Sequence, residues 1–340
     1  MTTWYSAPVA RSLTAPWERS GADAFHRSLP GYAPTPLVAA PAIAAELGVG
    51  RVLVKDESSR LGLGAFKVLG ASWACSQVLR RHPGATLVTA TDGNHGRAVA
   101  HMAAHFGVEA TVFVPRLMSR EAAARIAQEG ATLVWVDGDY DTTVRRAAAH
   151  VSERRDHELV QDTAWEGYQE VPAWIVEGYR TLLDEIDAAL DAAPSLVVVP
   201  VGVGSLAEAV VRHYRTPHVA HPSVLSVEPD TASCLLASLT AGHPVTVPTG
   251  ETIMAGLNCG TVSSASWPIL RDGCDAAISV SDADAVRAVE DLGRLGLSSG
   301  PSGAATLAGA RAALSDPGRR ADLGIGPDAV VVLLSTEGSN

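Results

Sequence analysis

The stretch of this 340-residue sequence that decides its fold is KDESSRLGLGAFK, residues 55–67. It predicts the end of a strand, a polar turn, a pair of glycines and then a lysine that opens a helix. The neighbours of Lys67 are apolar, and an apolar setting disfavours the ammonium form and lowers the pKa of a lysine. A lysine of lowered pKa is suited to forming a Schiff base. Considered alone, Lys67 would be interpreted as an ordinary lysine in the first turn of a helix, with its stem packed on that helix.

Short runs rich in β-branched residues recur on both sides of this stretch. Because none alternates strictly between apolar and polar residues, each is expected to be a strand buried on both faces. These runs are 51–55, 86–91, 110–115, 132–136, 195–201, 223–227 and 329–334. The segments with helical periodicity between them include 66–80, 96–106, 119–128, 141–153 and 171–189. This alternation predicts an α/β fold with parallel-rich sheets flanked by helices.

The spacing of the runs predicts two lobes. The runs at 86, 110 and 132 follow one another closely, whereas the next, at 195, comes after a long helical stretch. We therefore expect a smaller inserted α/β domain at 78–176 and a larger domain built from 1–77 and 177–340. Ligands of parallel sheets bind outside the carboxyl ends of the strands, so the active site is expected between the lobes.

Composition narrows the function classes. The net charge is −11 and the basic residues are scattered, so no nucleic-acid partner is expected. Since the sequence shows neither a signal peptide nor an apolar run of about 18 residues, we expect a cytoplasmic protein without a membrane partner. None of the four cysteines sits in a CxxC pair, so neither a metal site nor a disulfide scaffold is expected.

Three further segments follow predicted strands. In TATDGNHG, 89–96, amides before a helix near Arg97 could bind a carboxylate, or Asp92 and Asn94 could simply cap that helix. In VPVGVGSL, 199–206, two glycines let amides converge on a phosphate, and the third glycine of a dinucleotide motif is absent. In LSTEG, 334–338, a hydroxyl at a strand end could face a heteroaromatic nitrogen, or the segment could be a polar frayed end.

In this order the segments resemble fold-type II pyridoxal-phosphate enzymes, the tryptophan synthase β-subunit superfamily. Within it the resemblance is to the diaminopropionate ammonia-lyase family, because QDTAWEGY at 161–168 and TIMAGL at 252–257 are the more specific segments. Further matching segments are GYAPTPL at 31–37 and VEP at 227–229. The resemblance implies pyridoxal phosphate as cofactor, a small amino-acid substrate and a homodimer.

The resemblance also implies roles for individual residues. The implied cofactor contacts are Lys67, Phe66, Asn94, Gly202, Val203, Gly204, Ser205, Leu206 and Ser335, with Thr336 as a weaker candidate than Ser335 at the pyridine nitrogen. The implied substrate contacts are Thr91, Gly93, His95, Thr163 and Tyr168. The implied catalytic residues are Lys67, as Schiff-base lysine and base, Asp92, as the base on the opposite face, and Asp162, which would hold the leaving ammonium.

The implied reaction is α,β-elimination of ammonia from 2,3-diaminopropionate or a close β-substituted amino acid, giving pyruvate and ammonia. The rival functions are β-replacement, dehydration of serine or threonine, and pyridoxal-phosphate binding without turnover. The sequence departs from the family in a shorter segment between Lys67 and Asp92, in SGPSG at 299–303, which has proline where an acidic residue is usual, and in ending at Asn340. These departures bear on the identity of the substrate.

Two of the cysteines, Cys234 and Cys259, fall where the family carries a cysteine pair beside an active-site loop. The resemblance therefore implies that they lie close together. Since the cytoplasm keeps thiols reduced, we expect conditional oxidation at most.

Overall fold

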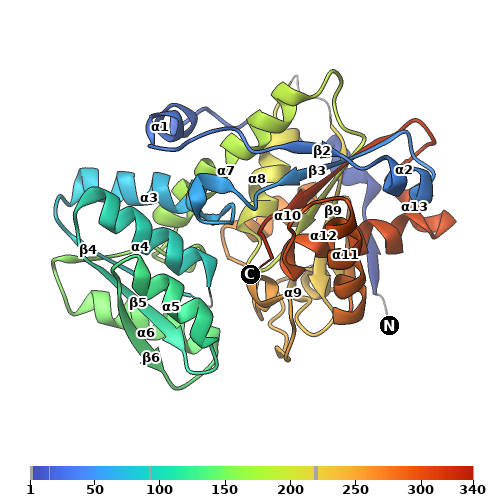
Figure 1. The fold of residues 1–340 in the computed structure, drawn as a ribbon. Coiled ribbons are helices and arrows are strands. Elements are labelled where there is room, and N and C mark those ends of the chain that lie inside the picture. The colour runs from blue at the N-terminus through green and yellow to red at the C-terminus, as the bar shows by residue number, and fades with distance from the viewer. Residues whose placement is uncertain (1–2, 15, 92, 218–220, 340) are drawn as a thin grey trace.

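The computed structural model describes residues 3–14, 16–91, 93–217 and 221–339, and these form two sheets in two lobes (Figure 1). The strands are β1 (Trp4–Ser6), β2 (Leu37–Ala39), β3 (Arg51–Asp56), β4 (Thr86–Ala90), β5 (Ala110–Pro115), β6 (Thr132–Val136), β7 (His157–Leu159), β8 (Leu196–Pro200), β9 (Ser223–Pro229), β10 (Ala276–Val280) and β11 (Val330–Ser335). The α/β class with parallel-rich sheets is confirmed.

Helices flank both sheets. They are α1 (Ala22–Ser28), α2 (Pro41–Leu47), α3 (Lys67–Arg81), α4 (Asn94–Phe106), α5 (Arg120–Gln128), α6 (Tyr140–Ser152), α7 (Glu170–Ala189), α8 (Ser205–Tyr214), α9 (Cys234–Ala241), α10 (Ser266–Gly273), α11 (Asp282–Arg294), α12 (Pro301–Leu314) and α13 (Pro317–Leu323). Three short 3₁₀ helices are η1 (Pro8–Ser12), η2 (Arg60–Gly62) and η3 (Ala255–Leu257). Among the described residues, no helix combines the length and the apolar character needed to cross a membrane.

The large sheet has seven strands in the order β1-β10-β9-β8-β11-β3-β2. Its five inner strands run parallel, and β1 and β2 pair antiparallel at the two edges. Every residue of β8 and β9 is buried, as the lack of alternation in their sequences indicates. The sequence pattern missed β10, whose residues AAISV include two alanines and few β-branched side chains.

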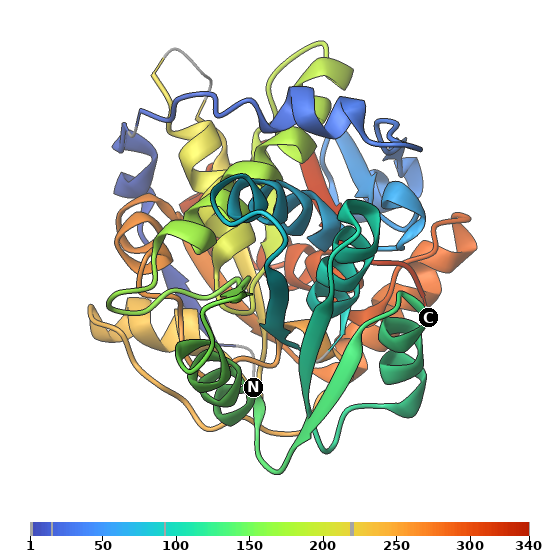
Figure 2. The same cartoon turned by 90° about the vertical axis from the view of Figure 1, so that its left-hand side faces the viewer.

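The small sheet has four parallel strands in the order β6-β5-β4-β7, and it faces the viewer in Figure 2. Its strands lie between Thr86 and Leu159, inside the segment 78–176, whose boundaries as a domain stay a prediction. The expectation that 132–136 is buried on both faces is wrong. Because β6 is an edge strand with one neighbour, its side chains lie partly in solvent, and Trp135 is 49% exposed.

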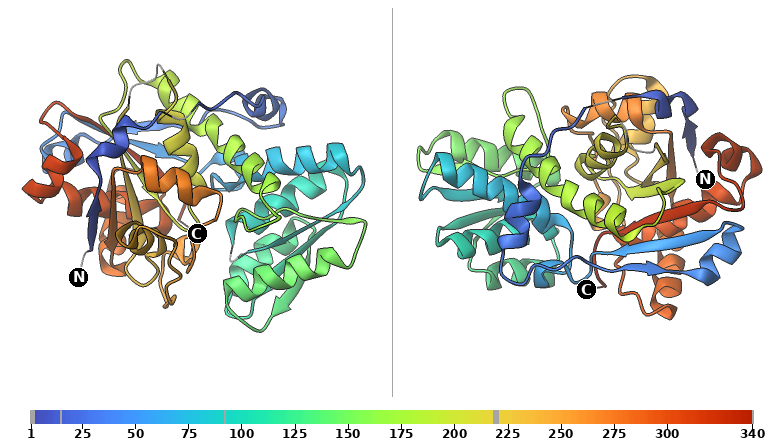
Figure 3. Two further views of the ribbon diagram at one scale, coloured as in Figure 1. Left: turned by 180° about the vertical axis from the view of Figure 1, so that it is seen from behind. Right: turned by 90° about the horizontal axis from the view of Figure 1, so that it is seen from above.

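Helices α3 and α7 pack against each other where the two lobes meet (Figure 3). The close approach of the two helices requires a glycine at position 178, because a Cβ atom there would lie 2.5 Å from the carbonyl oxygen of Leu69. His26 fastens the same turn by bridging the Thr181 hydroxyl at 2.7 Å and that carbonyl oxygen at 2.9 Å. The first turn of α3, which begins with Lys67, therefore rests on a closely packed base.

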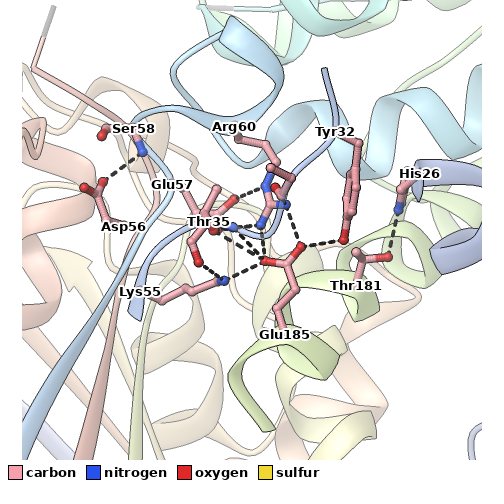
Figure 4. Close-up of polar contacts among 11 residues, drawn as sticks. His26, Tyr32, Thr35, Lys55, Asp56, Glu57, Ser58, Arg60, Thr181 and Glu185 are labelled. Atoms are coloured by element: carbon pink, nitrogen blue, oxygen red, sulfur yellow. Dashed lines mark hydrogen bonds and ion pairs between the residues drawn. The ribbon is translucent and has the colours of Figure 1, made fainter. Parts of the chain in front are cut away.

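Four charged side chains are buried together near the turn that leads to Lys67 (Figure 4). They are Lys55, Glu57, Arg60 and Glu185, and we call them the buried ion cluster. Arg60 donates to Glu185 through both terminal nitrogens at 2.7 Å, and Lys55 donates to it at 2.6 Å. Burial acts to raise the pKa of Glu185, but the hydrogen bonds and charges of Arg60 and Lys55 outweigh it and lower that pKa to about 2. Glu185 is therefore ionised at neutral pH, and it anchors Arg60.

Candidate active site

The segments singled out from the sequence lie at the carboxyl ends of parallel strands in both sheets. They follow β3, β4, β7, β8 and β11. Because the carboxyl ends of parallel strands meet at one edge of a sheet, each lobe presents these loops on one side. Two hydrogen bonds between loops of different strands, from Lys67 to Asp162 and from Asn94 to Glu337, show that the loops converge.

The turn before Lys67 is held in an unusual backbone conformation. Leu61 has a φ of 48°, in the left-handed region that a leucine rarely adopts. Phe66 donates its amide to the carbonyl of Thr336 at 3.0 Å, and Gly338 donates to the carbonyl of Gly64 at 2.9 Å. These bonds, together with Arg60 of the buried ion cluster, fix the turn between β3 and α3. They set the position of Lys67 among the converging loops.

Lys67 forms an ion pair with Asp162, and the Nζ to Oδ2 distance is 2.5 Å. The expectation of a lowered pKa for Lys67 is wrong in this structure. Burial does act to lower the pKa, but the negative charge of Asp162 outweighs it and raises the pKa above its ordinary value. Burial would likewise raise the pKa of Asp162, and the charge of Lys67 lowers it instead. The expectation was based on the apolar neighbours of Lys67 in the sequence, whereas Asp162 is 95 positions away in the chain.

Lys67 is one of only two lysines in the sequence. The other, Lys55, belongs to the buried ion cluster, and its side chain is 1% exposed against 18% for Lys67. The Nζ of Lys55 is held by Glu185 and by the carbonyl of Thr35. Lys67 is thus the lysine available to a ligand at these loops.

Two residues that sequence reasoning missed, Tyr140 and Gln161, lie beside Asp162. The Gln161 side-chain amide donates to the Tyr140 hydroxyl at 2.8 Å, and that hydroxyl lies 3.4 Å from Asp162 Oδ1. Gln161 could have been predicted as a site residue because it is next to Asp162 in the motif at 161–168. Nothing in the sequence indicated Tyr140.

His95, selected from the sequence as a substrate contact, is buried in the same region. Its Nε2 bonds the carbonyl of Val160 at 2.8 Å, while its Nδ1 has no hydrogen-bond partner. Burial lowers the pKa of His95, so the ring is neutral at neutral pH. Contact between His95 and a substrate stays a prediction.

The loop after β4 is organised by Thr91, whose hydroxyl accepts from the amides of Gly93 at 2.9 Å and Gly96 at 3.1 Å. Helix α4 begins at Asn94, three residues before the expected start near Arg97. The Asn94 side chain donates to Glu337 Oε2 at 2.7 Å, a carboxylate to which the sequence assigned no role. Asp92 lies outside the described residues.

The loop after β8 turns into α8 at Gly204, which has a φ of 100°. The first amides of a helix have no acceptor within it, so those at 205–207 are free to bind an anion. A Cβ atom at Gly202 would lie 2.9 Å from the carbonyl oxygen of Gly256, so this loop packs directly on the 252–260 segment. The same atom would lie 3.2 Å from Cys259 Sγ, and Cys234 Sγ lies 3.7 Å from the Gly202 carbonyl. Both cysteines flank Gly202, and neither is part of a disulfide.

Three other residues selected from the sequence are Ser335, Tyr168 and Thr163. Ser335 is buried at the end of β11, and its hydroxyl donates to Ser299 at 2.8 Å. The Tyr168 hydroxyl is engaged by the backbone, since it donates to the Leu159 carbonyl at 2.8 Å and accepts from the Gln161 amide at 2.9 Å. Thr163 is half-buried beside Asp162. Substrate contact by Tyr168 and Thr163 stays a prediction.

The donors fit pyridoxal phosphate. Backbone amides that can bind a phosphate lie at α8, an uncharged hydroxyl ends β11, and a lysine reaches the cleft from α3. The Tyr179 ring packs on Phe66 with centroids 4.8 Å apart, and its hydroxyl interacts with Lys67 and Ser205. The buried Nδ1 of His95 has no hydrogen-bond partner among the described residues. A buried polar atom without a partner is uncommon in proteins, and a polar ligand is one group that can satisfy it.

A separate hollow of about 660 Å³ lies on the outer side of the small lobe, between α5 and β6, and is lined by side chains including Arg116, Leu133 and Trp135. It contains none of the residues that sequence reasoning selected.

Comparisons with known proteins agree with this chemistry. A family model described as "Pyridoxal-phosphate dependent enzyme" matches residues 28–337. Diaminopropionate ammonia-lyase of Escherichia coli K12 is 38% identical over 348 residues, which cover 92% of this chain and 86% of the relative. Human serine dehydratase-like protein is 28% identical over 77% of each chain.

Solved structures show the same likeness. The crystal structure of the E. coli diaminopropionate ammonia-lyase in complex with an aminoacrylate-PLP azomethine reaction intermediate superposes with a TM-score of 0.90 and 36% identity. The superposition covers 99% of this chain and 94% of that one. The family match over nearly the whole chain and the placement of Lys67 among the converging loops lead to one conclusion: the chain belongs to the pyridoxal-phosphate-dependent enzymes, of the fold type shared with the diaminopropionate ammonia-lyases.

Proposed function

We propose that this enzyme eliminates ammonia from 2,3-diaminopropionate, or from a close β-substituted amino acid, to give pyruvate and ammonia. Pyridoxal phosphate is the cofactor. The observation that carries the proposal is the buried carboxylate of Asp162, which holds the ammonium group of Lys67 at 2.5 Å. A substrate with a β-ammonium group offers Asp162 the same chemical partner once Lys67 is bonded to the cofactor. The 38% identity to diaminopropionate ammonia-lyase supports the choice of substrate.

The residues of the chain divide the work. The amides at 202–206 bind the phosphate, Asn94 donates to the ring hydroxyl, and Ser335 faces the ring nitrogen without adding charge. When bound, the cofactor withdraws electrons from the substrate Cα and makes its proton acidic. Lys67 takes that proton on one face, and Asp162 holds the amine in its protonated form, the form in which it can leave.

A substrate panel tests the proposal. Purified protein with pyridoxal phosphate is incubated with D- and L-2,3-diaminopropionate, serine and threonine, and oxo-acid release is followed. We expect kcat/KM for at least one diaminopropionate enantiomer to exceed that for serine or threonine by about tenfold or more, because only diaminopropionate offers Asp162 an ammonium group on Cβ. Preference for serine or threonine would identify a dehydratase instead.

The same panel distinguishes elimination from β-replacement and from cofactor binding without turnover. Consumption of substrate only when a second nucleophile is added would indicate β-replacement. A chain that binds pyridoxal phosphate but releases no oxo acid from any of the four amino acids would be a binding protein without turnover.

Substitution of the two aspartates separates their roles. If Asp92 is the base on the face opposite Lys67, Asp92→Asn should abolish turnover of one enantiomer and spare most of the other. Asp162→Asn should slow both enantiomers by about 10²–10⁴-fold, because both expel the same ammonium group. The measurement is kcat/KM for each enantiomer with each variant. Equal losses for both enantiomers in Asp92→Asn would contradict the two-face scheme.

The family resemblance favours a homodimer in the cytoplasm. Analytical ultracentrifugation of the cofactor-bound protein tests the first of these, and a mass of twice 35.3 kDa is the expected result. A monomer at micromolar concentration would contradict it.

A further inference from the structure

We propose that Glu337 is a positioning residue for the cofactor, whose carboxylate fixes the side-chain amide of Asn94 and places a second negative charge beside Lys67. The inference rests on the proposed function in one respect, the placement of the cofactor ring next to Asn94. Glu337 lies in the segment that follows the carboxyl-terminal strand. It would be a further acidic residue of the site, besides Asp92 and Asp162, which the sequence indicated.

Both oxygens of the Glu337 carboxylate are engaged by the cleft. Oε2 accepts from Asn94 Nδ2 at 2.7 Å, and Oε1 accepts from the backbone amide of Ser302 at 3.2 Å. An ionised carboxylate only accepts hydrogen bonds, so it selects which end of the Asn94 amide faces it. The NH₂ group therefore turns toward Glu337. One N–H is used there, and the second remains for the ring hydroxyl of the cofactor.

The backbone of Glu337 cannot move independently of the turn that carries Lys67. Glu337 pairs with Ala65 in an isolated antiparallel bridge, and its carbonyl accepts from the Gly300 amide at 2.9 Å. Asn94 in turn opens α4 on the small lobe. The Asn94–Glu337 hydrogen bond thus joins the small lobe to the segment that sets the position of Lys67.

The carboxylate of Glu337 also interacts electrostatically with Lys67. Burial raises the pKa of Glu337 above its ordinary value, although hydrogen bonds from Ser302 and Asn94 and the positive charge of Lys67 act to lower it. The other titratable groups that act on Lys67 are Asp162, Tyr179, Cys259 and the neutral His95. Two carboxylates, Glu337 and Asp162, therefore act on the lysine that bonds the cofactor. Each favours a protonated nitrogen at that position.

Three substitutions separate charge from geometry. Glu337→Gln keeps an acceptor for Asn94 and removes the charge, Glu337→Asp keeps the charge and shortens the reach, and Asn94→Ala removes the partner. Glu109→Gln, at an exposed position next to the amino end of β5, is the matched control. For each variant, the pH at which the visible absorbance of the bound cofactor titrates and the dissociation constant of the cofactor are measured without substrate. Thermal melting establishes that each variant is folded.

We expect Glu337→Gln to lower the pH of the absorbance transition by about one unit, because a nearby negative charge no longer favours the protonated nitrogen. Glu337→Asp should leave the transition near that of the wild type but weaken cofactor binding. The binding effects of Glu337→Asp and Asn94→Ala should not add in the double variant, because the two residues act through one hydrogen bond.

The inference is overturned if Glu337→Gln titrates and binds the cofactor as Glu109→Gln does, or if the double variant shows additive effects. Because no substrate is present, failure to turn over diaminopropionate leaves this result unchanged and counts against the proposed substrate alone. A wild-type protein that develops no visible absorbance with pyridoxal phosphate would overturn both proposals.

Discussion

Lys67→Ala is expected to lower turnover of 2,3-diaminopropionate by at least about 10³-fold and to abolish the covalent attachment of the cofactor. The variant loses both the nitrogen that bonds pyridoxal phosphate and the base for the Cα proton. No other lysine can substitute, because Lys55 is buried and bound to Glu185. The attachment is measured by borohydride reduction followed by peptide mass mapping. In the wild type, the label should lie on the peptide that contains Lys67.

Lys67→Arg is the matched control for charge. An arginine keeps a cation beside Asp162 but forms no Schiff base, so it should fold and still lose the covalent label. Reduction that labels Lys55 in Lys67→Ala would show that the assignment of the cofactor lysine is wrong.

Glu185→Gln is expected to lower the free energy of unfolding by about 3–5 kcal/mol, the range observed when one partner of a buried ion pair is removed. The substitution leaves Lys55 and Arg60 with Glu57 as the remaining carboxylate of the buried ion cluster. Since the pKa of Glu185 is lowered to about 2, the stabilisation is present above about pH 4.5 and is lost as the pH falls toward 2. Denaturant titration at pH 7 measures the loss.

The matched control is Glu170→Gln, which removes an exposed ion pair with Arg81. Exposed pairs contribute about 0–1 kcal/mol, so this variant should unfold near the wild-type midpoint. Equal unfolding midpoints for the two variants would show that the buried ion cluster does not stabilise the fold. Because Arg60 leads into the turn before Lys67, Glu185→Gln should also weaken cofactor binding.

The positions of the strands with dense β-branched residues could be predicted from the sequence to within two residues at each end. The run 110–115 is β5 and the run 132–136 is β6, with the same bounds. The burial of β6 could not be read, because it depends on the position of the strand at the edge of its sheet and not on the strand's own residues. β10 was missed because alanines carry little strand signal.

The candidate site divides in the same way. Lys67, Asn94 and the 202–206 loop could be selected from the sequence as candidate site residues. Glycines and short polar side chains that follow a predicted strand indicate a ligand site within one local stretch. The raised pKa of Lys67 could not be predicted from the sequence, since it is caused by Asp162 in another loop. The buried ion cluster and the Asn94–Glu337 contact join residues 125 and 243 positions apart, and single-sequence patterns carry no such pairing.

The scarcity of lysine gives this protein an unusual chemical surface. With Lys55 in the interior and Lys67 in the cleft, arginine supplies the side-chain cations that face solvent, and guanidinium groups stay protonated at neutral pH. Amine-directed acylation, which on most proteins modifies many surface lysines, is here confined among side chains to the catalytic cleft. Because Asp162 holds Lys67 in its protonated form at neutral pH, a small acylating reagent should label Lys67 only at alkaline pH or after Asp162→Asn, and bound pyridoxal phosphate should protect it.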